Sequence, residues 1–204
     1  MGNRRASLDR IDAEIIRLLQ ENPDMPQEDI ANVLRLSQSS VGARIRRLRN
    51  DGVLIVQAGV NARRLGLSLA KVDCLCQNAT QVIDLFRRCP CFLNAFVTSG
   101  RYNVSLWFAA EDAVTLTALV DHHLRNNPNV KEVEFGLVVS WTNGFVVRPG
   151  LAVERSQTTP CGADCNGCPH YGPDECPGCP ATHSYTGNIW KLPRCRREII
   201  VPTK

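Results

Sequence analysis

The sequence predicts an α+β protein built from three consecutive segments, and three observations support this prediction. Apolar residues repeat at three- and four-residue steps through the first 50 residues, as they do in amphipathic helices. Strand-like and helix-like patterns then alternate between residues 67 and 141. Beyond residue 160 the chain is rich in cysteine, glycine and proline and poor in apolar residues. The domain boundaries expected from these changes are 1–60, 61–148 and 149–204.

The composition favours a soluble globular protein in a reducing compartment. The chain has 204 residues, a net charge of +4 and 10 cysteines. No apolar run approaches the roughly 18 residues that cross a membrane, and no apolar signal segment follows the basic first residues. We therefore expect a cytoplasmic location, where crowded cysteines indicate metal ligands more readily than disulfides.

The first segment predicts three short helices followed by a strand. A stripe of apolar residues predicts the first helix, with Ser7 as its N-cap and Asn22-Pro23 at its end. Pro26 fits the first turn of a second helix. Ser37 can cap a third helix that runs to about Asn50, before an apolar strand at Val53–Val56. This order predicts a winged helix-turn-helix over residues 1–60.

The third helix has the chemistry of a DNA-reading surface. Residues 35–64 hold seven arginines and one acid, Asp51. Val41, Ile45 and Leu48 share the core face, so polar and basic residues occupy the opposite side. Small polar groups near a helix N-terminus can approach base edges, and guanidinium groups can contact phosphates. The residues predicted to contact double-stranded DNA are Ser37, Gln38, Ser39, Ser40, Arg44, Arg46 and Arg47.

The second segment alternates strands and helices in the order βαββαβ. The predicted elements are strands at 67–75, 92–98, 102–109 and 130–141 and helices at 80–88 and 113–126. This order predicts a ferredoxin-like domain over residues 61–148, with four antiparallel strands and two helices on one face.

Several runs resemble the Lrp/AsnC (feast/famine) family of transcription regulators. The first is Leu8-Asp-Arg-Ile-Asp-Ala-Glu-Ile-Ile-Arg-Leu-Leu-Gln, which is similar to that family's first helix. The second is Leu36-Ser-Gln-Ser-Ser-Val-Gly-Ala-Arg-Ile-Arg-Arg-Leu, followed by Asp51-Gly52-Val53, in the region of the recognition helix. The third is Asn61-Ala-Arg-Arg-Leu-Gly66, which is similar to the hinge into the second domain.

The resemblance implies a homodimer, often assembled further, and an effector site beside a turn of the second domain. Family members commonly bind amino acids near a Thr-Gly-x-Tyr-Asp turn, and the corresponding residues here are Thr98, Gly100, Tyr102 and Asn103. This chain reads Thr98-Ser-Gly-Arg-Tyr-Asn103, with an inserted serine and no carboxylate. An amino-acid effector is therefore not expected.

The third segment has the spacing of a metal-binding module. Six cysteines follow residue 160: Cys161, Cys165, Cys168, Cys176, Cys179 and Cys195. Short turns between thiolates two or three residues apart bring the sulfurs close together, and a segment this poor in apolar residues needs such a clip. The sequence therefore predicts a small cysteine-rich module held together by a metal.

Two metals suit this pattern. Cys165, Cys168, Cys176 and Cys179 could hold one structural zinc. Cys161-x3-Cys165-x2-Cys168 has the three-cysteine spacing that radical-SAM enzymes use for a 4Fe–4S cluster. The tail also resembles a small cysteine-rich domain of anaerobic microbes, through Cys161-Gly-x-x-Cys165-x-x-Cys168-x-x-Tyr171, Cys176-Pro-Gly-Cys179 and Cys195. We favour a 4Fe–4S cluster over zinc, with the four ligands among the six cysteines left open.

The remaining cysteines and the paired histidines are expected to be structural. Cys74, Cys76, Cys89 and Cys91 fit small buried apolar positions better than a second metal site or a redox pair, which is the alternative. His122 and His123 are expected on a helix surface.

The sequence thus favours a transcription regulator that senses redox or iron–sulfur status through its tail, with no catalytic residues. A regulator with a purely structural zinc is one alternative. Another is an enzyme like the siroheme decarboxylases, which also resemble Lrp/AsnC proteins. Arg101-Tyr-Asn-Val-Ser-Leu-Trp107-Phe is similar to a strand of those enzymes, but Val97-Thr-Ser-Gly replaces their preceding histidine-containing stretch.

Overall fold

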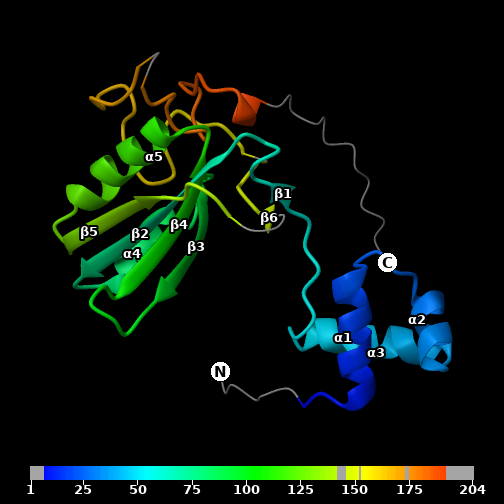
Figure 1. The fold of residues 1–204 in the computed structure, drawn as a ribbon. Helices are drawn as coiled ribbons and strands as arrows, with labels where there is room; N and C mark the ends of the chain where they lie inside the picture. The colour runs from blue at the N-terminus through cyan, green and yellow to red at the C-terminus, as the bar shows by residue number, and fades with distance from the viewer. Residues whose placement is uncertain (1–6, 142–145, 152, 173–174, 192–204) are drawn as a thin grey trace. The chain divides into compact units, whose positions relative to one another are not determined.

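The computed structural model describes residues 7–141, 146–151, 153–172 and 175–191, and the chain forms two compact units. The first unit ends at Ala58 and the second begins at Gly59 (Figure 1). Among the described residues, no helix is long and apolar enough to cross a membrane.

The first unit contains the three helices expected from the sequence: α1 (Arg10–Glu21), α2 (Gln27–Leu34) and α3 (Gln38–Asn50). The N-cap of α1 is Asp9, and the prediction of Ser7 was wrong. Asp9 and Asp12 form a capping box, in which each carboxylate accepts the other residue's backbone N–H, so the helix begins two residues later. Ser37 caps α3, as predicted, by accepting the amide of Ser40.

The apolar stripes of the three helices meet in one core, which contains Ile15, Ile30, Val41 and Leu48. The strand predicted at Val53–Val56 is not formed within the described residues. The amides of Val53 and Leu54 both donate to the carbonyl of Leu48, which holds this segment against the end of α3 and away from any strand partner. Only Leu54 is buried, whereas Ile55 and Val56 are exposed.

The second unit contains the predicted ferredoxin-like sheet. Its strands are β2 (Ser68–Cys76), β3 (Phe92–Val97), β4 (Val104–Ala110) and β5 (Val130–Leu137). They lie in the order β3-β4-β2-β5, and every neighbouring pair is antiparallel. The helices are α4 (Ala79–Phe86) and α5 (Ala113–Val120), and α5 continues into a π-helical turn, η1 (Asp121–Arg125).

The two helices cover one face of the sheet. Along β2, Ala70, Val72, Cys74 and Cys76 are buried in alternation with more exposed residues. The buried set packs with residues of α4 and α5 in a single core, so both helices cover the same face. β5 ends at Leu137, four residues before the predicted end at Trp141.

Two short strands, β1 (Val60–Asn61) and β6 (Val146–Val147), pair beside the main sheet. Gly59 permits this pairing, because a Cβ at that position would lie 2.4 Å from Cγ1 of Val146. The chain then continues into the tail.

The tail packs onto the ferredoxin-like domain as part of the same compact unit (Figure 1). Tyr185 is 4% exposed, and Trp190, in the short 3-10 helix η2 (Ile189–Lys191), is 5% exposed; both belong to the core of the sheet domain. The indole Nε1 of Trp190 donates to the carbonyl of Gly150 at 3.0 Å. We predicted a separate module over 149–204 without a core, but these two aromatic residues give the tail a share of the neighbouring core.

A carboxylate at the start of α5 anchors the same part of the tail. Glu111 accepts hydrogen bonds from the amides of Asn188 and Ile189 at 2.7 and 2.6 Å, and from the hydroxyl of Tyr185. A Cβ on Gly187 would lie 2.6 Å from the carboxylate oxygen of Glu111, so only glycine fits beside this anchor.

We expect Glu111→Gln to loosen the anchor for two reasons. The glutamine side chain carries no charge, and its NH2 group cannot accept a hydrogen bond from the backbone amides that the carboxylate now binds. Hydrogen bonds to a charged group contribute about 1.5–3 kcal/mol each, so we expect a loss of about 2 kcal/mol from the free energy of unfolding. Hydrogen exchange at Asn188 and Ile189 measures the loosening. Glu132→Gln is the control, since Glu132 forms only an exposed pair with Arg101. Unchanged exchange in Glu111→Gln would contradict the anchor.

Candidate functional site

The first turn of α3 presents a small polar surface to solvent. Gln38, Ser39 and Ser40 are all exposed. The hydroxyl of Ser37 lies 3.0 Å from that of Ser39 and 2.8 Å from that of Ser40, in addition to its capping bond. These residues lie together at one helix end, as the sequence predicted, and their contact with DNA stays a prediction.

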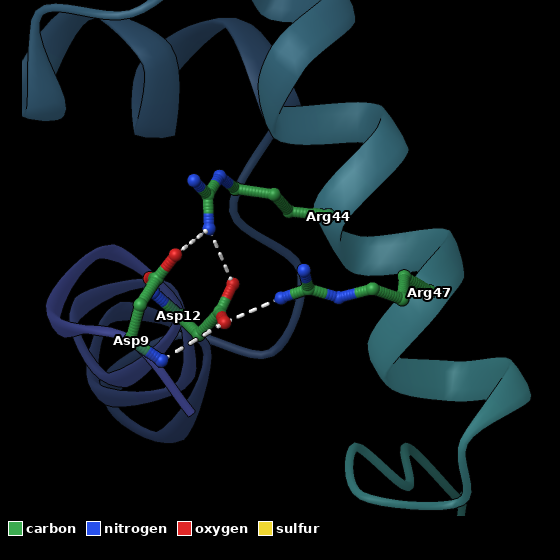
Figure 2. Close-up of polar contacts among 4 residues, drawn as sticks. All are labelled: Asp9, Asp12, Arg44 and Arg47. Carbon is green, nitrogen blue, oxygen red and sulfur yellow. Dashed lines mark hydrogen bonds and ion pairs between the residues drawn. The ribbon is translucent and has the colours of Figure 1, made fainter. Parts of the chain in front are cut away.

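Two arginines of α3 are held by carboxylates of α1. The fully buried Asp12 accepts from Nη1 of Arg44 at 2.8 Å and also from Nη2 of Arg47, and Arg44 reaches Asp9 at 2.5 Å. Figure 2 shows both guanidinium groups extending from α3 to these carboxylates. The hydrogen bond from Arg44 lowers the pKa of Asp9 and raises the pKa of Arg44. The cluster fixes the angle between the two helices and offsets part of the positive charge of α3.

Arg46 and Arg49 are not part of this cluster. Both are exposed, and within the described ranges neither forms an ion pair. Arg46 was among the predicted DNA contacts, whereas Arg49 was not singled out. Since their charge is not offset by a neighbouring carboxylate, these two arginines carry the positive field of the α3 surface.

A second surface feature is a cavity of about 80 Å³ in the other unit. Five cysteines of the tail line it: Cys161, Cys165, Cys168, Cys176 and Cys179. The sixth cysteine of the predicted metal set, Cys195, lies outside the described residues. The folding of the tail therefore brings five of the six predicted ligands to one space.

The ferredoxin-like domain lines the other side of this cavity with four more side chains of the types that can bind metals. These are Cys89 and Cys91, from the turn before β3, and His122 and His123, from the π-helical turn η1. We expected His122 and His123 on a helix surface, but the π turn directs both toward the cavity. Nε2 of His123 lies 3.7 Å from Sγ of Cys161, and Nδ1 of His122 lies 3.9 Å from Sγ of Cys168.

Free thiols line much of the cavity. All nine cysteines in the described part of the chain are free. Among the same residues, no three cysteine, histidine or acidic side chains are already close enough to hold a metal ion. The donor set nevertheless suits a soft metal, since thiolates and imidazoles are the ligands of zinc and of iron–sulfur clusters.

Burial raises the pKa of several of these thiols. Burial raises the pKa of Cys179 to about 12 and raises the pKa of Cys176 and Cys165 in the same direction. The pKa of Cys91 is raised well above its usual range, first by its hydrogen bond with Cys89, then by burial and by the charges of Cys89, Cys179 and Cys176. The charges of the tail cysteines Cys176 and Cys179 thus affect the pKa of Cys91 in the domain.

The other two domain cysteines have a different environment. Cys74 is fully buried in the core, and burial raises its pKa to about 12. The thiol and backbone amide of Cys76 both donate to the side-chain oxygen of Asn103. Neither residue lines the cavity.

The turn at residues 98–103, where the sequence suggested an effector site, forms hydrogen bonds within itself and with β2. The hydroxyl of Thr98 donates to the carbonyl of Tyr102, and the amide of Thr98 donates to that of Asn103. The side-chain oxygen of Asn103 accepts the backbone amide of Cys76, and the side-chain NH2 of Asn103 donates to the carbonyl of Cys76. Gly100 is exposed at the tip of the turn.

These features define a class of protein: a helix-turn-helix head joined to a ferredoxin-like domain. Residues 8–55 match the family of winged helix-turn-helix DNA-binding domains. The architecture is that of the Lrp/AsnC proteins. E. coli AsnC superposes with a TM-score of 0.59 at 14% identity, covering 68% of this chain and 96% of AsnC. B. subtilis LrpC superposes with a TM-score of 0.56 at 22% identity, covering 68% of this chain and 99% of LrpC.

Two archaeal proteins are similar in sequence. An uncharacterized HTH-type transcriptional regulator of Pyrococcus horikoshii is 25% identical over 142 residues, which are 68% of this chain and 90% of that protein. The HTH-type transcriptional regulator FL11 of Pyrococcus furiosus is 27% identical over 121 residues, which are 57% of this chain and 80% of that protein. Each match leaves about a third or more of this chain uncovered.

Proposed function

We propose that the chain is a DNA-binding transcription regulator of the Lrp/AsnC type whose cysteine-lined cavity binds a 4Fe–4S cluster and reports redox or iron–sulfur status. The exposed surface of α3 is the observation that carries the DNA-binding part. It combines exposed polar side chains in the first turn with the guanidinium groups of Arg46 and Arg49, which form no ion pair within the described residues. The similar proteins of Pyrococcus are named as transcriptional regulators, which supports the same function.

The resemblance to Lrp/AsnC proteins supports a homodimer on DNA. A two-fold symmetric dimer binds a pseudo-palindromic site with half-sites about one helical turn, or about 10 bp, apart or a multiple of it. No residue arrangement in the described chain favours tetrapyrrole chemistry over this function, since His122 and His123 face cysteines.

The DNA-binding part is tested by replacing Arg46. We expect Arg46→Ala to weaken binding to all duplexes, because the side chain supplies a phosphate contact that does not depend on sequence. The slope of log affinity against log salt concentration should fall by about 1 in magnitude. Fluorescence anisotropy with labelled duplex DNA at several salt concentrations measures this slope.

Arg17→Ala is the matched control for Arg46→Ala. Arg17 lies on α1 and pairs with Glu14 and Glu21, so its removal takes the same charge from the same unit. The control should bind DNA like the unsubstituted protein. If both variants lose affinity equally, the effect is one of net charge, and α3 is not the contact surface.

The metal part is supported by the chemistry of the cavity. A 4Fe–4S cluster needs four ligands, and the cavity offers more thiols than that in the described part of the chain. When bound, the cluster would supply a redox-active centre. The tail cysteines would bind it, while the anchor at Glu111 and Trp190 would hold the tail against the domain.

A further inference from the structure

The cysteines that bracket Pro90 face the tail across the cavity, and the proposed regulator function does not yet use them. Cys89 and Cys91 line the same cavity as the five tail cysteines. All four cysteines of this domain lie in or against its core, but Cys74 and Cys76 do not line the cavity. The difference separates two pairs of cysteines that sequence reasoning had treated alike.

The backbone around Cys89 and Cys91 is held firmly in place. The amide of Cys89 donates to Phe86 at 2.9 Å, and the carbonyl of Cys91 accepts from Ala109 of β4 at 2.8 Å. Between them, the carbonyl of Pro90 accepts the amide of Gly150 at 3.0 Å. A Cβ on Gly150 would lie 3.3 Å from Cα of Pro90, so the first residues of the tail pass in close contact with this turn.

The tail cysteines, by contrast, lie on turns. Cys168 donates its amide to Cys165, Tyr171 donates to Cys168, and Thr182 donates to Cys179. The amide of Cys179 also donates to Sγ of Cys165 at 3.4 Å. This contact brings the pair Cys165 and Cys168 close to the pair Cys176 and Cys179. Turns of this kind can adjust around a metal, whereas a binding site gains precision from ligands on rigid elements.

We propose that Cys89 and Cys91 bind the same metal centre as the tail cysteines, so that the centre links the ferredoxin-like domain to the tail. The inference rests on the metal-binding part of the proposed function. It also suggests how the metal could affect the rest of the protein. Binding or losing the metal makes or breaks a link between the tail and the turn that leads into β3. With the ligands divided between two elements, the tail alone binds the centre more weakly than the tail and the domain together.

The test uses Co²⁺ added to the reduced, metal-free full-length protein. Thiolate-to-cobalt absorption reports how many sulfurs bind the ion, and titration gives the affinity. We expect Cys89→Ala/Cys91→Ala to reduce this absorption and to weaken Co²⁺ binding at least about tenfold, since loss even of outer-shell partners weakens metal binding by 10–100-fold. Cys74→Ala/Cys76→Ala removes the same number of thiols from the same domain and should keep both values.

Two outcomes separate the inference from the function on which it rests. Absence of cobalt–thiolate absorption in the unsubstituted protein would overturn the metal-binding function and the inference with it. Equal absorption and affinity in Cys89→Ala/Cys91→Ala and the unsubstituted protein would overturn the inference alone.

A second measurement needs no substitution, and it decides the question even if the variant fails to fold. In the full-length protein loaded with ¹¹³Cd²⁺, through-bond NMR correlations join each bound metal to the Hβ protons of its cysteine ligands. The proposal requires correlations from Cys89 and Cys91. Correlations from tail cysteines only would overturn it.

Discussion

Asp12→Asn should destabilise the helix-turn-helix unit strongly. The asparagine keeps the volume of the side chain but loses the charge that pairs with Arg44 and Arg47. Breaking a buried ion pair by removing one partner commonly costs about 3–5 kcal/mol. Arg44 and Arg47 keep 26% and 49% of their side-chain surface exposed, so water can solvate them once the carboxylate is lost. We therefore expect a smaller loss, about 2–3 kcal/mol.

Urea unfolding followed by far-ultraviolet circular dichroism measures this loss, because α1, α2 and α3 contribute much of the helical signal. Hydrogen exchange in peptides of α1 and α3 localises it to the first unit. Glu14→Gln is the matched control: Glu14 lies on the same helix and pairs with Arg17, but both side chains are more than 40% exposed. Such exposed pairs contribute about 0–1 kcal/mol. Equal midpoints for Asp12→Asn and Glu14→Gln would mean that the cluster does not hold the helices together.

Removing the metal should change the affinity of the protein for DNA. Protein purified without oxygen should show a broad visible absorption band and contain about four iron and four sulfide per chain if the centre is a 4Fe–4S cluster. Allosteric coupling between two sites commonly amounts to 1–3 kcal/mol, or about 5–150-fold in affinity. We expect a change within that range between cluster-loaded and cluster-free protein.

The measurement uses duplexes selected from a random pool by the loaded protein, at one fixed salt concentration. Loaded and cluster-free protein are titrated with the same duplex. Equal affinities would exclude redox sensing through the tail and leave DNA binding by α3 untouched. A colourless protein with about one zinc per chain would instead make the tail a structural clip. In that case chelation should speed hydrogen exchange around Cys165 and Cys176, with slower exchange retained at Ile189, where Glu111 still anchors the chain.

Much of the fold could be predicted because its elements are determined locally. The apolar stripe of α1, the cap of α3 at Ser37 and the alternation along β2 are each readable within one stretch of sequence. The order of the elements then selects the antiparallel sheet β3-β4-β2-β5. The strand at Val53–Val56 was predicted wrongly because the prediction used only the local sequence. An apolar run predicts burial, but a strand also needs a hydrogen-bonding partner.

The candidate sites were predictable only in their chemistry. The sequence indicates that α3 is basic and that the tail is rich in thiols. It does not show that Asp12 holds Arg47, which lies 35 residues away, and leaves Arg46 free. Nor does it show that Cys168 meets His122, which lies 46 residues away, or that Trp190 joins the core of the sheet.

The sequence by itself therefore determined the kinds of element, their order and the types of donor available for DNA and for a metal. Only the tertiary structure decided which charges are paired and which cysteines share a cavity. The physical reason is the range of the interactions. Helical and strand periods arise from contacts between near neighbours, whereas ion pairs and metal sites join side chains whose distance in space depends on the packing of the whole unit.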